Sequence, residues 1–279
     1  HLRNVVTLNQ INTGGALLLQ YIKEILSKSR YMAILCFLFG IWYPGNVSGQ
    51  NIETMSIPYP DTSLAYKLDE AMLVSRYNLD SSYSLIYNIY TQSIAQNYPF
   101  GMFQSALFLG ILHSFQGEYV PANKWFITAI SYSNITSRPV FHLCRAVNNI
   151  GNLLHFQGDY QRAIQYYFSI IPIAERTLPQ DSLISNPLIG LYTSTASLLT
   201  TLEDYEKALY YLDKAEIMAH KYECMDRLPP VYAYKALVYG KTGDKNKASE
   251  YNNRALDIGV QTRNEEVQFM AFYNMAPIS

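Results

Sequence analysis

The side chains best suited to chemistry lie together in one short stretch of the sequence. It contains the residues Arg145, Asn148, Asn149, Asn152 and His155. At about 100° per residue, this spacing places all five on one face of a helix. An asparagine costs up to ~0.7 kcal/mol in a helix relative to alanine, so three of them in five residues indicate a use for their amides. An amide both donates and accepts hydrogen bonds, so we expect this face to hold the backbone of an extended peptide.

The main alternative is that this polar face is simply solvated. The sequence contains none of three common catalytic or phosphate-binding patterns: a glycine-rich phosphate loop, HExxH or GxSxG. The histidines are scattered over several predicted helices, and the three cysteines lack metal-ligand spacing. A formal net charge of −1 gives no positive excess to attract nucleic acid. We therefore predict a protein that is not an enzyme and that has no cofactor, no metal site and no nucleic-acid partner.

Two amphipathic helices joined by a tight Gly158-Asp159 turn must position the polar face. On the first helix an apolar stripe is expected opposite the asparagines, formed by Leu143, Val147, Ile150 and Leu154. The second helix has its own stripe, formed by Tyr160, Ala163, Ile164, Tyr167 and Ile171. Neither helix can bury its apolar face alone, so similar helix pairs must stack on both sides.

The same pattern recurs along the chain. An alanine follows each turn, at positions Ala122, Ala163, Ala208 and Ala248, with Tyr83 expected in its place in the first repeat. A small residue of the preceding helix recurs with the same period, at Ala71, Gly110, Gly151, Ala196 and Ala236. Prolines mark the joints at Pro60, Pro99, Pro139 and Pro179. Three markers with one period of roughly 40 residues predict an array of helix pairs.

The array is expected to contain five helix pairs and a sixth first helix that begins near Asn264. The predicted pairs are Asp61–Tyr77 with Ser81–Gln96, Gly101–Gln116 with Tyr119–Ser133, Val140–Gln157 with Tyr160–Arg176, Pro187–Leu202 with Tyr205–His220, and Pro230–Lys241 with Lys245–Ile258. Pro172 falls inside a predicted helix, where a proline removes a backbone hydrogen bond, so a bend is expected near Phe168–Ser169.

A small residue, a Gly-Asp-Tyr turn and an alanine three residues later resemble the tetratricopeptide repeat over residues 61–279. The repeats are longer than the usual ~34 residues, like those of kinesin light chain and related peptide-binding arrays. The resemblance implies an all-α, right-handed superhelical solenoid whose first helices line a concave groove. It also implies that asparagine and arginine in this groove hold the main chain of a ligand. The matching face of the neighbouring repeats carries Gln104, Ser114, Thr193, Ser197 and Thr200.

A different signal precedes the repeats. Basic residues from Lys23 onward come before an apolar run, Tyr31–Tyr43, and small residues follow at Ser48 and Gly49. This is the layout of a secretory signal peptide. We therefore expect a leader over residues 1–49, a linker over residues 50–60 and a solenoid over residues 61–279 that is cut off within its sixth repeat. Export to a bacterial periplasm or cell envelope is predicted, with a cytoplasmic location as the alternative.

These observations together predict a non-catalytic module that binds a protein or peptide in its concave groove. The resemblance extends to the sensory region of exported bacterial regulators, which implies the sensory or scaffold part of a longer signalling regulator. Membrane contact is expected only through the leader or a C-terminal continuation. The alternative function is a structural self-assembly module that uses the edges of the solenoid, with a homo-oligomer as the product.

Overall fold

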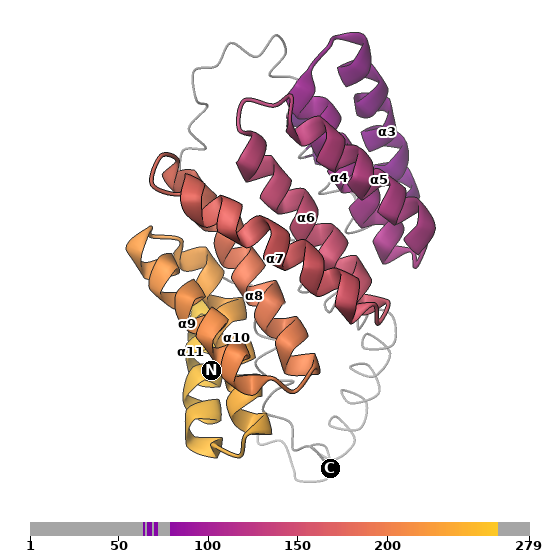
Figure 1. Ribbon diagram of the computed structural model, residues 1–279. Helices are drawn as coiled ribbons and strands as arrows, with labels where there is room; N and C mark the ends of the chain where they lie inside the picture. The colour runs from indigo at the N-terminus through magenta and orange to yellow at the C-terminus, as the bar shows by residue number, and fades with distance from the viewer. Residues whose placement is uncertain (1–63, 65, 69, 72–78, 262–279) are drawn as a thin grey trace, which may run out of the picture.

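The computed structural model describes residues 64, 66–68, 70–71 and 79–261 (Figure 1). Within these ranges the chain is helical and contains no strand. The α-helices are α3 (Leu79–Ala95), α4 (Pro99–Phe115), α5 (Tyr119–Ser133), α6 (Pro139–Phe156), α7 (Tyr160–Thr177), α8 (Ser185–Thr201), α9 (Tyr205–Lys221), α10 (Leu228–Lys241) and α11 (Lys245–Gln261). Short 3-10 turns, Ser182–Ile184 and Met225–Arg227, precede α8 and α10.

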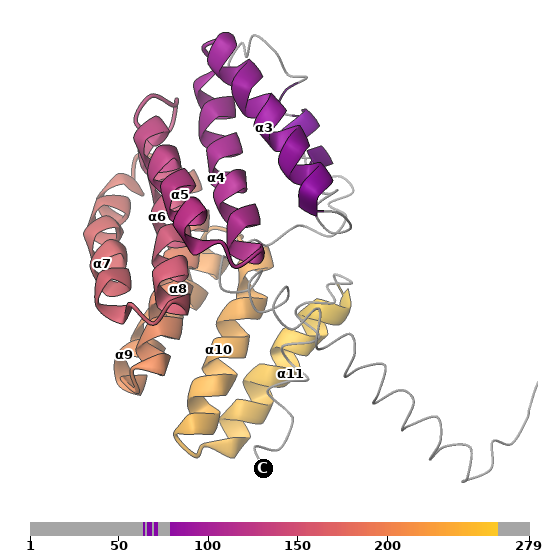
Figure 2. The ribbon, with the colours of Figure 1, turned by 90° about the vertical axis from the view of Figure 1, so that its right-hand side faces the viewer.

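The helices pack in pairs, and the pairs stack on one another. Helices α4, α6, α8 and α10 each pack against the helix that follows, and we call them the first helices of their repeats. In Figure 1 the second helices α5, α7 and α9 lie in front of α4, α6 and α8, and Figure 2 shows these layers from the side. Successive first helices also touch, as α6 does with α4 and α8. The predicted all-α solenoid of helix pairs is confirmed, and the described helices of repeats two to five end within three residues of their predicted bounds.

The turn between α6 and α7 shows how the sequence closes each pair. Gly158 has a φ of 80°, a left-handed conformation that glycine adopts without steric cost. The backbone N–H of Asp159 then donates to the carbonyl of Leu154 at 2.9 Å, which satisfies a carbonyl at the end of α6. The Asp159 carboxylate accepts from the backbone N–H of Arg162 at 3.2 Å and so caps the start of α7.

The small residues mark the closest approach of the two helices in a pair. A Cβ atom placed on Gly151 would lie 2.7 Å from Cζ of Tyr167 and closer still to its Cε1. A Cβ atom on Gly110 would lie 2.5 Å from Cδ1 of Phe126. Both rings are fully buried and belong to the second helix of the same repeat. In these two repeats the periodic small residue therefore makes room for a large ring from the partner helix.

One predicted register is wrong in the first repeat. The buried positions of α3 are Ser82, Ile86, Ile89 and Ser93, and those of α5 are Ala122, Phe126, Ala129 and Ser133, with the same spacing. Ser82, not Tyr83, therefore occupies the alanine position, and its hydroxyl donates to the carbonyl of Ala71 at 2.6 Å. Serine is small enough for the contact, whereas Tyr83 is half-buried and stacks on Tyr87.

Helix α7 is continuous through Pro172. The helix thus tolerates the lost backbone hydrogen bond, and packing against the neighbouring helices α6 and α8 holds it together.

Several predictions fall on parts of the chain that the structure does not describe. These are the signal-peptide segment Lys23–Gly49, the linker 50–60, most of the first predicted helix and the helix expected near Asn264. Among the helices that are described, none combines the length and the apolar character needed to cross a membrane.

Candidate functional site

The predicted polar face on α6 is sheltered from solvent. Asn148, Asn149 and His155 are each less than a tenth exposed, and Asn152 is 1% exposed. Helix α6 lies against α5, α7 and α8. Its asparagines are buried, as are Val147, Ile150 and Leu154 of the apolar stripe. The alternative interpretation, a simply solvated face, is therefore wrong for these four residues. A buried polar side chain must find hydrogen bonds or pay for their loss, which makes its partners informative.

Arg145 and Asn149 connect α6 to the repeat before it. The Arg145 guanidinium donates from Nη1 to Oε1 of Gln104 at 2.7 Å and lies 5.7 Å from the centroid of the Phe103 ring. Nδ2 of Asn149 donates to the backbone carbonyl of Arg145 at 2.8 Å. Because its nitrogen is fixed in this way, the Asn149 amide has a defined orientation that leaves its oxygen for another donor.

Asn152 faces the second helix of its own repeat. The Tyr167 hydroxyl donates to Oδ1 of Asn152 at 2.5 Å. The side chain of Ser194 on α8 also hydrogen-bonds to the Tyr167 hydroxyl. Burial raises the pKa of Tyr167, so this phenol stays protonated and remains a donor. Asn152 therefore also holds the repeat together, unlike Asn148, which has no comparable bond to α7.

His155 connects α6 to the next repeat. Its Nε2 lies 3.0 Å from the hydroxyl of Thr201 at the end of α8, and its ring meets the edge of Tyr160. Burial lowers the pKa of His155 to about 4, so the ring is neutral at pH 7. Sequence reasoning missed Thr201, because nothing in its spacing indicates a histidine 46 residues away.

Four buried polar atoms on α6 have no hydrogen-bond partner within the part of the chain that the structure describes. They are Oδ1 of Asn148, Oδ1 of Asn149, Nδ2 of Asn152 and Nδ1 of His155. An unsatisfied buried polar group costs about 1–3 kcal/mol. The two oxygens are acceptors and the amide nitrogen is a donor, which are the groups needed to pair with the N–H and C=O of another backbone.

The other predicted site residues are also buried and lie on the neighbouring first helices. The hydroxyls of Ser114, Thr193 and Thr200 each donate to a carbonyl four residues earlier in their own helix, which leaves their oxygens as acceptors. Ser197 donates to the hydroxyl of Tyr234 at 2.9 Å and so joins α8 to α10. All ten predicted residues thus lie on the first helices of three successive repeats, α4, α6 and α8.

A charged cluster that the sequence did not reveal lies at the other end of the array. Lys235 of α10 is only 2% exposed, and its ammonium donates to Asp213 at 2.5 Å and to Glu216, both on α9. Burial alone would lower the pKa of Lys235, but the two carboxylates outweigh it and raise the pKa. The available signal was a lysine within the apolar segment Tyr234–Val238 of a first helix. Elsewhere, no group of three His, Cys, Asp or Glu side chains in the described residues could hold a metal.

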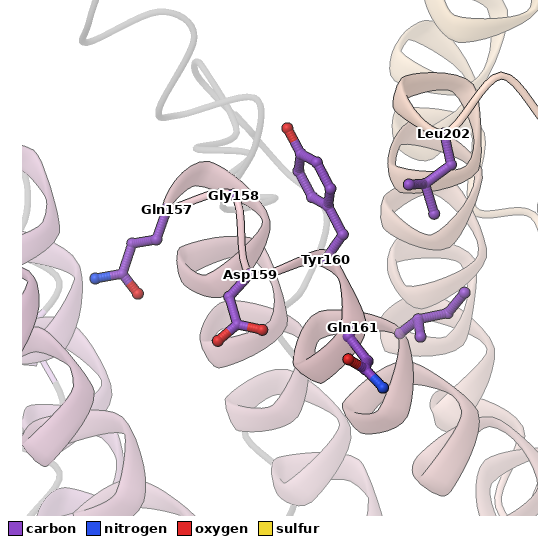
Figure 3. Close-up of a pocket in the computed structure, with 7 residues that line it drawn as sticks. Gln157, Gly158, Asp159, Tyr160, Gln161 and Leu202 are labelled. Atoms are coloured by element: carbon purple, nitrogen blue, oxygen red, sulfur yellow. The ribbon is translucent and has the colours of Figure 1, made fainter.

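A shallow, open hollow of about 700 Å³ lies at the turn between α6 and α7 (Figure 3). It is lined by Gln157, Gly158, Asp159, Tyr160, Gln161, Ile164 and Leu202. Its carboxylate, on Asp159, is already paired with Arg162 at 2.5 Å. The hollow is therefore a by-product of the helix-capping turn and gathers no reactive set of side chains.

Comparison with known proteins agrees with this geometry. The tetratricopeptide repeat pattern matches residues 145–167, which run from the polar face of α6 into α7. No curated protein gives a significant match to the sequence.

Solved structures share the fold at low sequence identity. Aspartyl phosphate phosphatase F from Bacillus subtilis aligns with a TM-score of 0.59 and 12% identity, covering 94% of this chain and 61% of that one. BtubC (BKLC) from P. vanneervenii aligns with a TM-score of 0.55 and 16% identity, over 77% and 82% of the two chains. A putative kinesin light chain repeat protein from P. anserina aligns with a TM-score of 0.51 and 15% identity, over 72% and 97%. The expected resemblance to tetratricopeptide arrays is confirmed at the level of the fold.

Proposed function

We propose that this chain binds an extended segment of another protein along the face of α6 that carries Asn148 and Asn149. The observation that carries the proposal is the set of buried, unpartnered amide and imidazole atoms on this helix. A folded protein rarely keeps several such atoms without a purpose, because each costs about 1–3 kcal/mol.

The backbone of an extended peptide carries the hydrogen-bond donors that these side chains lack. Its N–H groups would donate to Oδ1 of Asn148 and Asn149. The Asn149 amide is already oriented by its bond to the carbonyl of Arg145. Orientation before binding lowers the entropy lost when the ligand docks.

The experiment uses peptides as the probe. A library of random 12-residue peptides displayed on phage is selected on the whole chain, and the best binders are labelled and measured by fluorescence anisotropy. Removing two hydrogen bonds with Asn148→Ala and Asn149→Ala is expected to weaken binding by about 1–3 kcal/mol, or roughly 5- to 150-fold. Asn253→Ala, the same change on the exposed face of α11, is the matched control and is expected to have no effect.

Two outcomes would overturn the proposal. One is that no displayed peptide binds better than an unselected one. The other is that the Asn148→Ala, Asn149→Ala variant binds the selected peptides as tightly as the unmodified chain and the Asn253→Ala control do. If Asn148→Ala and Asn149→Ala instead change the oligomeric state measured by light scattering, the structural self-assembly alternative is favoured.

We also propose that the chain is the exported sensory or scaffold part of a longer signalling regulator. The support is the signal-peptide pattern of Lys23–Gly49 in the sequence together with the interaction-module fold. Residues 1–60 fused to an alkaline phosphatase that is active only outside the bacterial cytoplasm are expected to give enzyme activity. A fusion that stays inactive, while a known signal peptide activates the same reporter, would contradict export.

A further inference from the structure

Helices α3 and α5, at the upper right of Figure 1, carry aromatic side chains that contact one another and reach the surface. We call this set the outer cluster, and it consists of Tyr83, Tyr87, Tyr90, Trp125 and Tyr132. Trp125 meets Tyr90 edge to face, with ring centroids 5.0 Å apart, and the hydroxyls of Tyr90 and Tyr132 lie 3.2 Å from each other. Because the rings support one another, the surface is ordered before any partner arrives, and Tyr87 is 44% exposed.

Two exposed carboxylates lie at one end of the outer cluster. Asp80 is exposed and shares one face of α3 with Tyr83 and Tyr87, because helical residues three and seven positions apart lie on the same side. Glu118, just before α5, has a side chain that is 52% exposed and lies 2.5 Å from Nδ1 of His113. The His113 ring is edge-on to Tyr83, with centroids 5.2 Å apart. This end therefore combines aromatic faces with negative charge.

Elsewhere in the chain, the same combination of a tyrosine ring and a carboxylate holds a cation. The Lys214 ammonium lies 4.7 Å from the centroid of the Tyr192 ring and donates to Glu175. Two further sites follow this pattern: Arg254 with Tyr251 and Glu250, and Lys247 with Tyr239 and Asp244. In each case the ring face attracts the cation and the carboxylate neutralises it.

The composition of α3 and α5 favours a protein as the partner. Asp80 and Lys124 are the charged side chains of these two helices, whereas α9 carries charges along its whole length. Tyrosine and tryptophan with few charges are typical of the centre of protein–protein interfaces. Leu85 and Ile127 add apolar surface, being 45% and 50% exposed. An anionic membrane is disfavoured, because Asp80 and Glu118 would repel it.

From these contacts we infer that the outer cluster is a second docking surface, for a protein segment that presents a lysine or arginine. The basic side chain lies against Tyr83 and Tyr87, with the two carboxylates as its counter-charges. Apolar residues of the same segment pack on Trp125. This surface is separate from the asparagine face of α6, so the inference goes beyond the proposed function and does not depend on it.

The test uses two phage-displayed libraries of 12-residue peptides, which differ only in a central residue fixed as lysine or as glutamine. Both are selected on the whole chain. The lysine library is expected to yield peptides whose affinity falls about tenfold or more with Tyr87→Ala and with the Asp80→Asn, Glu118→Gln variant. The matched control is Tyr210→Ala on α9, which removes a tyrosine that is 56% exposed and is expected to leave these peptides unaffected.

Three results would overturn the inference. The first is that no selected peptide is sensitive to Tyr87→Ala, and the second is that sensitive peptides come equally from both libraries. The third is that Tyr87→Ala lowers the urea midpoint far more than Tyr210→Ala does, because the cluster would then be covered by the chain itself. The Asn148→Ala, Asn149→Ala variant is expected to bind these peptides as the unmodified chain does, so failure here and failure of the proposed function are distinguishable.

Discussion

The contact between Gly151 and Tyr167 predicts that Gly151→Ala destabilises the protein, although helix propensity alone would make the same change stabilising. Alanine is favoured over glycine in a helix by up to ~1 kcal/mol, so Gly151→Ala in the interior of α6 would stabilise an isolated helix. In the protein the added methyl group would lie 2.7 Å from Cζ of Tyr167. The ring cannot retreat easily, because it is fully buried and its hydroxyl is bonded to Asn152. Overpacking of this kind costs about 1–3 kcal/mol, which offsets or exceeds the propensity gain, so we expect a net loss of up to roughly 2 kcal/mol.

The chain offers a matched control in Gly190, which lies in the interior of α8 with nothing within 4 Å of the place where its Cβ would be. Gly190→Ala is expected to stabilise the protein by up to ~1 kcal/mol. Both variants are compared by urea unfolding followed by circular dichroism. Adding Tyr167→Leu to Gly151→Ala should cost less than the sum of the two single changes. A Gly151→Ala variant as stable as the Gly190→Ala variant would refute the close-packing argument.

Two further predictions concern buried charge. Lys235→Met leaves the exposed Asp213 without its counter-ion and leaves Glu216 with only Arg254, whose Nη1 lies 3.9 Å away, so we expect a loss of about 1–3 kcal/mol in urea unfolding, reduced when Glu216→Gln is added. A second effect is on pH dependence: burial lowers the pKa of His155 to about 4 and, with nearby arginines, that of His142 to about 3. The unfolded chain then binds more protons than the folded one below about pH 6.5, so stability should fall by up to ~1.4 kcal/mol per pH unit per histidine as the pH drops from 6.5 towards 4. Urea midpoints at pH 7 and pH 5 measure this loss, and His155→Gln should reduce it.

The sequence predicted the stacking of the fold well because its markers report on packing. The positions of Gly151 and Gly110 recur since a large ring must fit against each of them. The one register error, at Ser82, came from treating alanine as the required residue, whereas the contact requires only a small side chain. The helix predicted across Pro172 is continuous in the structure, because helix packing outweighs the local cost of a proline.

The site was harder to predict than the fold. Spacing alone placed the asparagines on one face, but it could not show that both sides of α6 are covered, because this depends on α5, α7 and α8. It also could not separate Asn152, which bonds to Tyr167, from Asn148, which does not. The partners of buried polar groups come from distant repeats, such as Thr201 for His155, and helical periodicity carries no information about them.

The central claim is that the oxygens of Asn148 and Asn149 accept hydrogen bonds from a ligand backbone. An N-methyl scan of the tightest selected peptide tests it most directly, because each methyl group removes one backbone N–H and leaves the side chains unchanged. The account predicts that methylation at one or two adjacent central positions weakens binding about tenfold to the unmodified chain and much less to the Asn148→Ala, Asn149→Ala variant. A scan that is flat, or that gives the same losses in both proteins, would contradict it.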